Sequence, residues 1–388
     1  MGNRVPFPIA TGKRLGYHGV MPDTYHALAL FSGGLDSILA MKTLQAQGLR
    51  ILGLHFCSPF FGHPDRIEHW KRIYDLEIQS VDVHQEFIDL LLTGPRFGFG
   101  KVLNPCVDCK ITMLTRAKSL LPIYGARFLV SGEVLGQRPM SQRRDTLNLI
   151  SKQAEVRDIL LRPLCAGHLD PTPMEREGLV DRSGLHAISG RGRKDQLRLA
   201  AEFGLPEIPT PAGGCLLTER ESAKRFWPVL TRIPEPSPRD FALANIGRQF
   251  WNGRLWMVVG RNKADNEALE GMASTEDLLF KAVDVQGPLA LGRGKPGISW
   301  TEEDVRQAAD FVAGFSAKKR PPGQAAQIRL VRDARPHTLE CPAQASGNAP
   351  TWMEFTWDEA RQEKQDRFTQ DQGKQSGVEQ ADRHPPQS

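Results

Sequence analysis

The sequence predicts an α/β protein with a doubly wound, mostly parallel sheet, followed by a smaller α+β domain and a disordered tail. Two observations support the parallel sheet. Short apolar runs alternate with helix-like stretches from residue 25 to about 165, which is the pattern of repeated β-α-β units. Polar or glycine-rich residues directly follow several of these runs, as expected where parallel strands end at one edge of a sheet.

The expected strands are the apolar runs 25–31, 50–57, 78–83, 127–131 and 158–162. A helix is expected over Arg193–Phe203, because Gly204 and Pro206 stop the pattern there. Farther on, Pro234, Pro236 and Pro238 form a cluster that predicts a linker.

These features predict a flexible arm over 1–22, a first domain over 23–232, a second domain over 239–335 and a disordered tail over 342–388. The tail is rich in Gln, Asp and Lys, so it can bury too little apolar surface to offset the entropy of ordering. The first 20 residues are basic without an apolar core, which does not fit a secretory signal.

Composition narrows the class of protein further. No run of about 20 apolar residues occurs, so no membrane span is predicted. The six cysteines are too scattered for a disulfide framework, which favours a cytoplasmic location where thiols stay reduced. A net charge of +5 permits a polyanionic partner without requiring one.

A glycine turn links the first predicted strand to the helix-like run 37–44. Backbone N–H groups and the positive end of the helix dipole meet at such a turn, which suits a phosphate. The chain lacks the G-x-x-x-x-G-K-[ST] phosphate loop, and this turn lacks the dinucleotide-binding G-x-G-x-x-G. The predicted phosphate-binding residues are Ser32, Gly33, Gly34 and Ser37.

This turn resembles the S-G-G-x-D-S loop of the PP-loop ATP pyrophosphatases, which have an adenine nucleotide alpha hydrolase-like fold. Those enzymes cleave ATP between its α and β phosphates to adenylate a carbonyl oxygen. We expect the adenine near His55 and Phe56, at the end of the second predicted strand. Asp36 is expected to help hold Mg²⁺, because a hard cation prefers carboxylate oxygen.

Three of the cysteines are candidates for chemistry. Cys106 and Cys109 form a C-x-x-C within Asn104–Lys110, which alone fits a redox pair, half of a metal site, or chance. Cys215 lies in a glycine turn over Pro211–Glu219 that would leave its sulfur accessible. The other three, Cys57, Cys165 and Cys341, are expected to be buried or idle thiols.

Around these cysteines the sequence is similar to two families of tRNA thiolation enzymes. Asn-Pro followed by the C-x-x-C, with a later Gly-Gly-Cys, resembles the tRNA 2-thiouridylases and implies that Cys109 and Cys215 form the sulfur-handling pair. The segments 131–137, 141–142, 147–150 and 161–164 resemble the tRNA 4-thiouridine synthases more closely. That resemblance implies ATP contacts at Lys110, Gly132 and Gln142, although Gln142 stands one residue beyond the family spacing.

Neither the N-terminal RNA-binding module nor the rhodanese domain of those synthases is recognisable, so we expect tRNA binding to be arranged differently. Met257–Leu269, Phe280–Val285 and Glu302–Lys319 resemble the predicted RNA-binding domain NFACT-R of ribosome quality-control and fibronectin-binding-like proteins. The residues expected to contact RNA are Arg261, Lys263, Lys281 and Arg293. The alternative is a solvated basic face on a structural domain.

Together these resemblances imply an ATP-dependent tRNA-uridine sulfurtransferase, and two sulfur schemes remain open. One is a persulfide–disulfide cycle on Cys109 and Cys215, with the thiol pKa lowered by cations such as Lys110. The other is a four-iron four-sulfur cluster on Cys106, Cys109 and Cys215. The sulfur donor would be a cysteine desulfurase, a persulfide carrier or free sulfide.

The block from Gly132 to Ile150 favours 4-thiouridine, whereas Asn104–Cys109 favours the 2-carbonyl of a wobble uridine. Two other classes stay open. A PP-loop enzyme that transfers nitrogen needs no paired cysteines, so the three cysteines disfavour it. A non-enzymatic, nucleotide-regulated RNA-binding protein is disfavoured by the intact Asp36 and Lys110.

Overall fold

The computed structural model describes residues 24–210, 214–342 and 352–367. The chain forms two compact units that divide between Thr218 and Glu219, and each is described by itself. Within the described ranges no helix is both long and apolar enough to cross a membrane.

The first unit contains the predicted parallel sheet. Its five strands lie in the order β3-β2-β1-β4-β5, and every pair is parallel. The strands are β1 (Ala27–Leu30), β2 (Ile51–Cys57), β3 (Glu77–Asp82), β4 (Phe128–Ser131) and β5 (Leu160–Leu161). All coincide with the predicted runs to within a few residues, so the predicted fold class is confirmed. β1, β2 and β4 are buried along their whole length, as expected for parallel strands covered on both faces.

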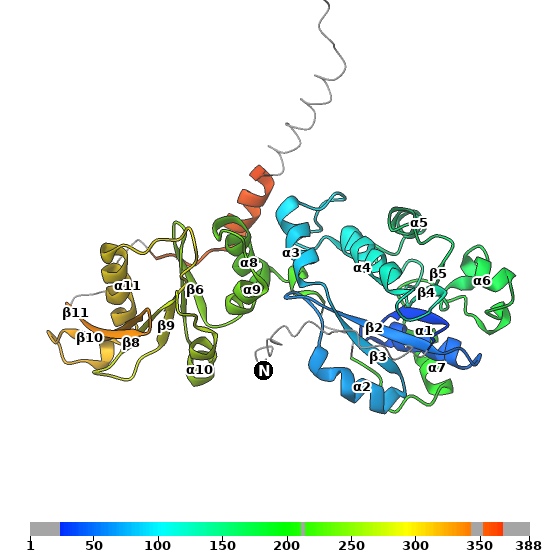
Figure 1. Ribbon diagram of the computed structural model, residues 1–388, viewed down its shortest axis with the longest axis horizontal. Helices are drawn as coiled ribbons and strands as arrows, with labels where there is room; N and C mark the ends of the chain where they lie inside the picture. Colours follow the sequence, from blue (N-terminus) through cyan, green and yellow to red (C-terminus); the bar gives the residue numbers. More distant parts are fainter. Residues whose placement is uncertain (1–23, 211–213, 343–351, 368–388) are drawn as a thin grey trace, which may run out of the picture. The chain divides into compact units, whose positions relative to one another are not determined.

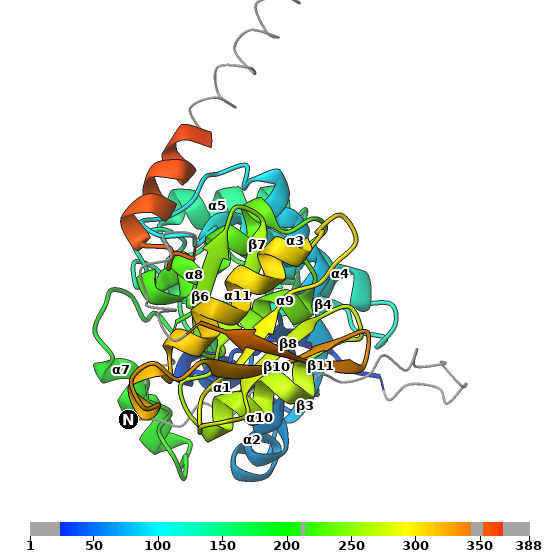
Figure 2. The ribbon, with the colours of Figure 1, turned by 90° about the vertical axis from the view of Figure 1, so that its left-hand side faces the viewer.

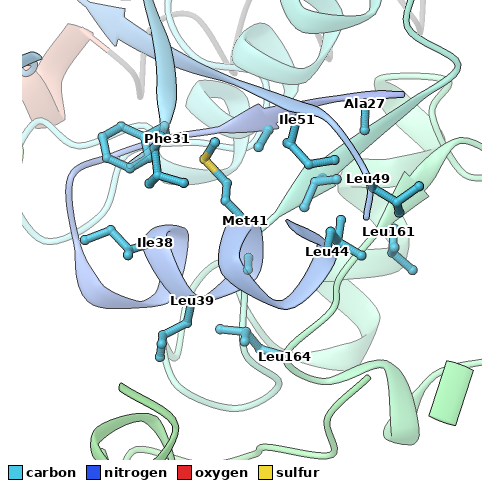
Figure 3. Packing of buried hydrophobic residues seen from close by; sticks show 14 of the residues in the cluster. Ala27, Phe31, Ile38, Leu39, Met41, Leu44, Leu49, Ile51, Leu161 and Leu164 are labelled. Carbon is cyan, nitrogen blue, oxygen red and sulfur yellow. The ribbon is translucent and has the colours of Figure 1, made fainter. Parts of the chain in front are cut away.

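Helices cover both faces of this sheet. Figure 1 shows α3, α4 and α5 on one side and α1, α2 and α7 on the other. The helices are α1 (Leu35–Gln45), α2 (Ile67–Tyr74), α3 (His84–Thr93), α4 (Cys106–Leu120), α5 (Arg144–Gln153), α6 (Pro173–Arg176) and α7 (Lys194–Glu202). α7 is the helix predicted over Arg193–Phe203. Figure 3 shows the packing of α1, with Met41 and Leu44 lying between the helix and the strand residues Ala27 and Ile51.

The strand order places a site in this unit. From β1 the chain proceeds to β2 and β3 on one side, and then returns to place β4 on the other side of β1. Loops that leave β1 and β4 therefore diverge at their carboxyl ends, and such a reversal is where open α/β sheets bind ligands.

The second unit is built on a separate antiparallel sheet of six strands in the order β11-β10-β8-β9-β7-β6. Its strands are β6 (Arg248–Asn252), β7 (Leu255–Val259), β8 (Leu278–Ala282), β9 (Leu289–Gly292), β10 (Ala326–Arg332) and β11 (Arg335–Cys341). Its helices are α8 (Arg220–Arg232), α9 (Pro238–Ala244), α10 (Lys263–Met272) and α11 (Glu302–Gly314). α11 packs on β8, β10 and β11, and α10 packs on β9. This is the α+β domain that the sequence predicts.

The proline cluster does not form the linker that the sequence predicts. Pro238 starts α9, and Ser237 caps that helix together with Asp240. The preceding helix, α8, belongs to the second unit, where Phe226 packs edge-on against Phe241 of α9 with 5.8 Å between ring centroids. The boundary thus falls earlier than the predicted end at residue 232.

Part of the predicted tail is ordered. A helix covers residues 357–367 and is drawn in red in Figures 1 and 2. It is preceded by Trp352, which stacks on Trp300 with 5.7 Å between ring centroids, and Glu363 pairs with Arg232 at 2.7 Å. A tryptophan and an ion pair anchor this segment, which composition alone does not reveal. The predicted arm and the rest of the tail lie outside the described residues.

Candidate nucleotide and thiol site

The glycine turn after β1 is closed by hydroxyl hydrogen bonds. Gly34 is the N-cap of α1, and Ser37 Oγ donates to the Gly34 carbonyl at 2.7 Å. The Gly34 N–H donates to Ser32 Oγ, and the Ser32 N–H to Ser37 Oγ, each at 3.3 Å. The predicted phosphate-binding residues therefore form one compact turn at the N-terminus of α1, where the helix dipole favours an anion.

Two glycines allow this turn to approach its neighbours closely. Gly33 has a φ of 76°, and a Cβ at this position would lie 2.4 Å from the Trp70 ring. A Cβ at Gly132, directly after β4, would lie 2.5 Å from the Asp36 carbonyl oxygen. The loop after β4 therefore touches the first turn of α1, and the structure brings Gly132 together with the phosphate turn as predicted.

The same loop orients Asp36. Gln137 Nε2 donates to Asp36 Oδ2 at 3.0 Å, which fixes the carboxylate that would face a bound cation. Sequence reasoning missed a role for Gln137. Its position was nevertheless informative, because it lies in the loop that leaves β4 at the reversal of strand order.

The buried carboxylate of Glu133 holds Lys110 in an ion pair. Glu133 is 2% exposed, and Arg162 Nε lies 3.0 Å from its Oε2. Lys110 Nζ lies 3.8 Å from Oε1, which makes an ion pair rather than a hydrogen bond. Burial opposes ionisation of Glu133, but Lys110 and Arg162 outweigh it and hold its pKa below the ordinary value. Two cations around one carboxylate leave a net positive charge beside the phosphate turn.

Gln142 is a buried side chain with an unsatisfied acceptor. It is 5% exposed, and its amide oxygen has no hydrogen-bond partner among the described residues. A buried polar atom without a partner is costly, so a donor from a bound ligand would stabilise this site. The observation supports the predicted role of Gln142 as a ligand contact.

Two backbone groups engage the side chain of His55. Its Nδ1 lies 3.0 Å from the Phe31 carbonyl, and its Nε2 accepts from the His63 N–H at 2.8 Å. Because Nε2 accepts a hydrogen bond, the contacts require the neutral ring, and burial lowers its pKa in the same direction. No ring nitrogen remains for a nucleotide, and Phe56 is also buried, at 5% exposure. The side chain of His55 therefore has a structural role.

The cysteines of the C-x-x-C lie one turn apart at the start of α4. Asn104 Nδ2 donates to Cys106 Sγ at 3.1 Å. Two backbone hydrogen bonds hold the segment after Cys215 nearby, from Leu216 to Phe60 at 2.8 Å and from Leu103 to Leu217 at 3.0 Å. Because Leu103 directly precedes the Asn104–Cys109 segment and Leu217 lies two residues after Cys215, these bonds place Cys215 near the start of α4.

The electrostatics of Cys109 differ from the prediction. Burial raises its pKa well above the ordinary thiol value, and the neighbouring Cys215 raises it further. Lys110 and Arg138 act in the opposite direction but are outweighed. Lys110 thus lowers the pKa of Cys109 as expected, but burial outweighs it, because desolvation of a thiolate costs more free energy than these cations provide.

Thiols are the donors that an iron–sulfur cluster uses, so the residue types fit one. However, no group of three His, Cys, Asp or Glu side chains in the described ranges is arranged to hold a metal ion. Cys57, Cys165 and Cys341 are buried, as expected for thiols outside the chemistry.

The four predicted RNA contacts separate into different environments. Arg293 is 5% exposed and binds Asp240 and Asp277 at 2.8 and 2.9 Å, so its assignment to RNA is wrong. The prediction failed because the sequence does not reveal that two buried carboxylates neutralise this arginine. Arg261 pairs with Asp265 at 2.7 Å, and Lys263 lies 3.6 Å from Glu267. Lys281 is exposed on β8.

Two family models match the two units separately. Residues 24–170 match the family model of the thiamine biosynthesis protein ThiI, and residues 247–353 match that of the NFACT protein RNA binding domain. A tRNA-specific 2-thiouridylase MnmA of Nitratidesulfovibrio vulgaris is 25% identical over 323 residues, covering 76% of this chain and 84% of the relative. The corresponding protein of Petrotoga mobilis is 28% identical over 129 residues, covering 28% of this chain and 35% of that relative.

Solved structures align over parts of the chain. A predicted subunit of tRNA methyltransferase from Methanocaldococcus jannaschii is 16% identical with a TM-score of 0.27, covering 35% of this chain and 68% of the other. The C-terminal part of the fibronectin/fibrinogen-binding protein from Streptococcus suis is 13% identical with a TM-score of 0.22. The alignment covers 61% of this chain and 94% of the other.

Proposed function

We propose that this chain, which joins a ThiI domain to an NFACT RNA-binding domain, is an ATP-dependent sulfurtransferase acting on a uridine of tRNA. One observation carries the proposal. In the loop after β4, Gln137 binds Asp36 of the phosphate turn, and Met140 Sδ lies 4.0 Å from Asn104 Nδ2, which also donates to Cys106 Sγ at 3.1 Å. One loop thus contacts both the nucleotide site and the start of the C-x-x-C, which suits a reaction that activates a carbonyl with ATP and then delivers sulfur.

In the first step, the phosphates of ATP lie on the turn from Ser32 to Ser37. The uracil carbonyl oxygen attacks the α-phosphorus, pyrophosphate leaves, and the base is linked through that oxygen to AMP. Mg²⁺, when bound, neutralises the phosphates, and the Asp36 carboxylate is a suitable ligand for it. Lys110 adds a fixed positive charge beside the turn, held by Glu133.

In the second step, a terminal persulfide sulfur on one cysteine of the Cys109–Cys215 pair attacks the activated carbon, and AMP leaves with the oxygen. The base is then joined to the enzyme through a disulfide. The other cysteine attacks the enzyme's own sulfur in that bond, which releases the thiolated base and leaves a Cys109–Cys215 disulfide. A sulfane sulfur donor and a thiol reductant must restore the pair before the next turnover.

For the position of the sulfur we favour 4-thiouridine, because the block from Gly132 to Ile150 resembles the 4-thiouridine synthases. The names of the curated relatives support 2-thiouridine as the alternative. A cytoplasmic location, where thiols stay reduced, is part of the proposal.

The test is nucleoside mass spectrometry of tRNA incubated with the protein, ATP, Mg²⁺, a thiol reductant and a sulfane sulfur donor such as a cysteine desulfurase with cysteine. We expect 4-thiouridine from the wild type and none from Cys215→Ser, while Cys215→Ser still binds ATP. Cys341→Ser, a buried thiol of the other unit, is the matched control and retains activity. Wild-type thionucleoside levels in Cys215→Ser would contradict the proposal. If the product is 2-thiouridine, the sulfurtransferase proposal stands but the assignment to the 4-carbonyl is wrong.

An anaerobic absorption spectrum after reconstitution with iron and sulfide separates the two sulfur schemes. The persulfide cycle predicts no charge-transfer band that depends on these cysteines. A broad visible band that disappears in each of Cys106→Ala, Cys109→Ala and Cys215→Ala would overturn the cycle in favour of a cluster.

A further inference from the structure

One face of the sheet in the second unit is not covered by any described helix along three of its strands. α11 packs against β8, β10 and β11 and buries Phe280, Ile328 and Leu330 on its side. In Figure 1, α11 lies above these strands, whereas α10 lies nearer to β6 and β9. Side chains alternate along a strand, so the neighbours of those buried residues point to the opposite face.

The strand register defines this opposite face as three rows. We call it the open sheet face, and its residues are Leu279, Val331 and Pro336 in one row, Lys281, Arg329 and Thr338 in the next, and Val283, Gln327 and Glu340 in the third. All nine residues are exposed or half-buried, and the apolar Val283 is 55% exposed. On the adjacent strand β9, Leu291 of the same face is fully buried. The open sheet face is therefore confined to β8, β10 and β11.

Its two cations have no acidic partner among the described residues. Lys281 lies directly opposite Arg329 across the two strands, and neither side chain has a hydrogen bond or ion pair with any described residue. Like charges in this arrangement destabilise a sheet. By contrast, Arg320 of the same unit binds Asp284 at 2.5 Å. The acid of the open sheet face, Glu340, is bonded to Gln327 at 3.3 Å.

We propose that the open sheet face is the surface through which this unit binds tRNA. Two adjacent cations without acidic partners complement the phosphates of a polyanion, and they flank apolar side chains, Leu279 and Val331, on which riboses and bases can pack. The opposite side of the sheet fits RNA poorly, because α11 begins with the acidic residues Glu302, Glu303 and Asp304. This inference rests on the proposed function, since it takes tRNA as the substrate.

The experiment measures the affinity of the full chain for a fluorescently labelled tRNA over a series of salt concentrations. We expect roughly a tenfold loss of affinity for each of Lys281→Ala and Arg329→Ala. The slope of log affinity against log salt should fall by about one for each cation removed. Arg306→Ala is the matched control, because it removes an equal charge from an exposed position on α11, and it should bind like the wild type.

The outcomes separate this inference from the proposed function. Wild-type affinity and salt slope in the Lys281→Ala/Arg329→Ala double variant would overturn the inference. A loss of tRNA affinity only in Lys263→Ala would also overturn it, because the RNA-binding surface would then lie on α10. Loss of a protein partner from the double variant with tRNA binding intact would assign the face to that protein instead. Failure of the wild type to bind tRNA at all would contradict the proposed function itself.

Discussion

Gly33 and Gly48 offer a controlled comparison at the level of single residues. Both have a positive φ, 76° and 77°, but a Cβ at Gly48 would meet no atom within 4 Å, whereas one at Gly33 would meet the Trp70 ring at 2.4 Å. Gly48→Ala should cost only backbone strain, about 1–2 kcal/mol. Gly33→Ala should lower the free energy of unfolding further and also weaken ATP binding.

Chemical denaturation and nucleotide titration of both variants check this comparison. Equal stability losses with unchanged ATP affinity in Gly33→Ala would mean that Trp70 moves aside easily and that the phosphate turn tolerates the shift.

Gln137 is expected to act through Asp36 rather than by contact with a reacting atom. Gln137→Leu keeps the size of the side chain but removes the donor 3.0 Å from Asp36 Oδ2, a charge-assisted bond worth about 1.5–3 kcal/mol. We expect kcat for pyrophosphate release to fall by roughly 10- to 100-fold and the Mg²⁺ concentration for half-maximal rate to rise. Gln79→Leu, an exposed change on β3, is the control. An unchanged Mg²⁺ dependence would show that Gln137 has only a packing role.

At the level of elements, Glu133 joins β4, α4 and β5 through Lys110 and Arg162. Because the folded state lowers its pKa, the carboxylate stabilises the fold above the ordinary glutamate pKa, and this contribution is lost as pH falls through the lower folded value. Glu133→Gln leaves two cations without their counter-charge and should cost about 3–5 kcal/mol at neutral pH.

The difference in unfolding free energy between wild type and Glu133→Gln should therefore shrink in acid, as urea denaturation at several pH values can measure. Glu68→Gln, which removes an exposed pair with Lys71, should cost at most about 1 kcal/mol. A cost in Glu133→Gln that does not change with pH would show that packing, not charge, makes this position important.

The parallel sheet could be predicted from sequence because strands such as β1, buried on both faces, form unbroken apolar runs. The boundary at Thr218 could not be predicted, because the packing of Phe226 on Phe241 is a tertiary contact, whereas the proline cluster between them suggests a linker. In the site, the glycines and hydroxyl residues of the turn from Ser32 to Ser37 could be recognised from their sequence motif. The use of both His55 nitrogens by backbone, and of Arg293 by two acids, depends on the tertiary fold and carries no local signal.

At the level of the whole molecule, two units with separate hydrophobic cores lie on one chain. Under the proposed function, the second unit holds tRNA while the first activates and thiolates a base. Tethering makes the second event intramolecular, which commonly raises overall affinity by about 10²–10⁴-fold. Chains divided between Thr218 and Glu219 should therefore each keep their own ligand, ATP for the first and tRNA for the second.

A mixture of the two separate chains should thiolate tRNA with a much higher KM than the intact protein, by roughly 100-fold or more, while the affinity of the first chain for ATP stays unchanged. Steady-state thiolation assays on the intact chain, the mixture and the first chain alone provide the comparison. Equal KM values for tRNA in all three would mean that the first unit recognises tRNA unaided, and the basic residues of the second unit would then need another partner.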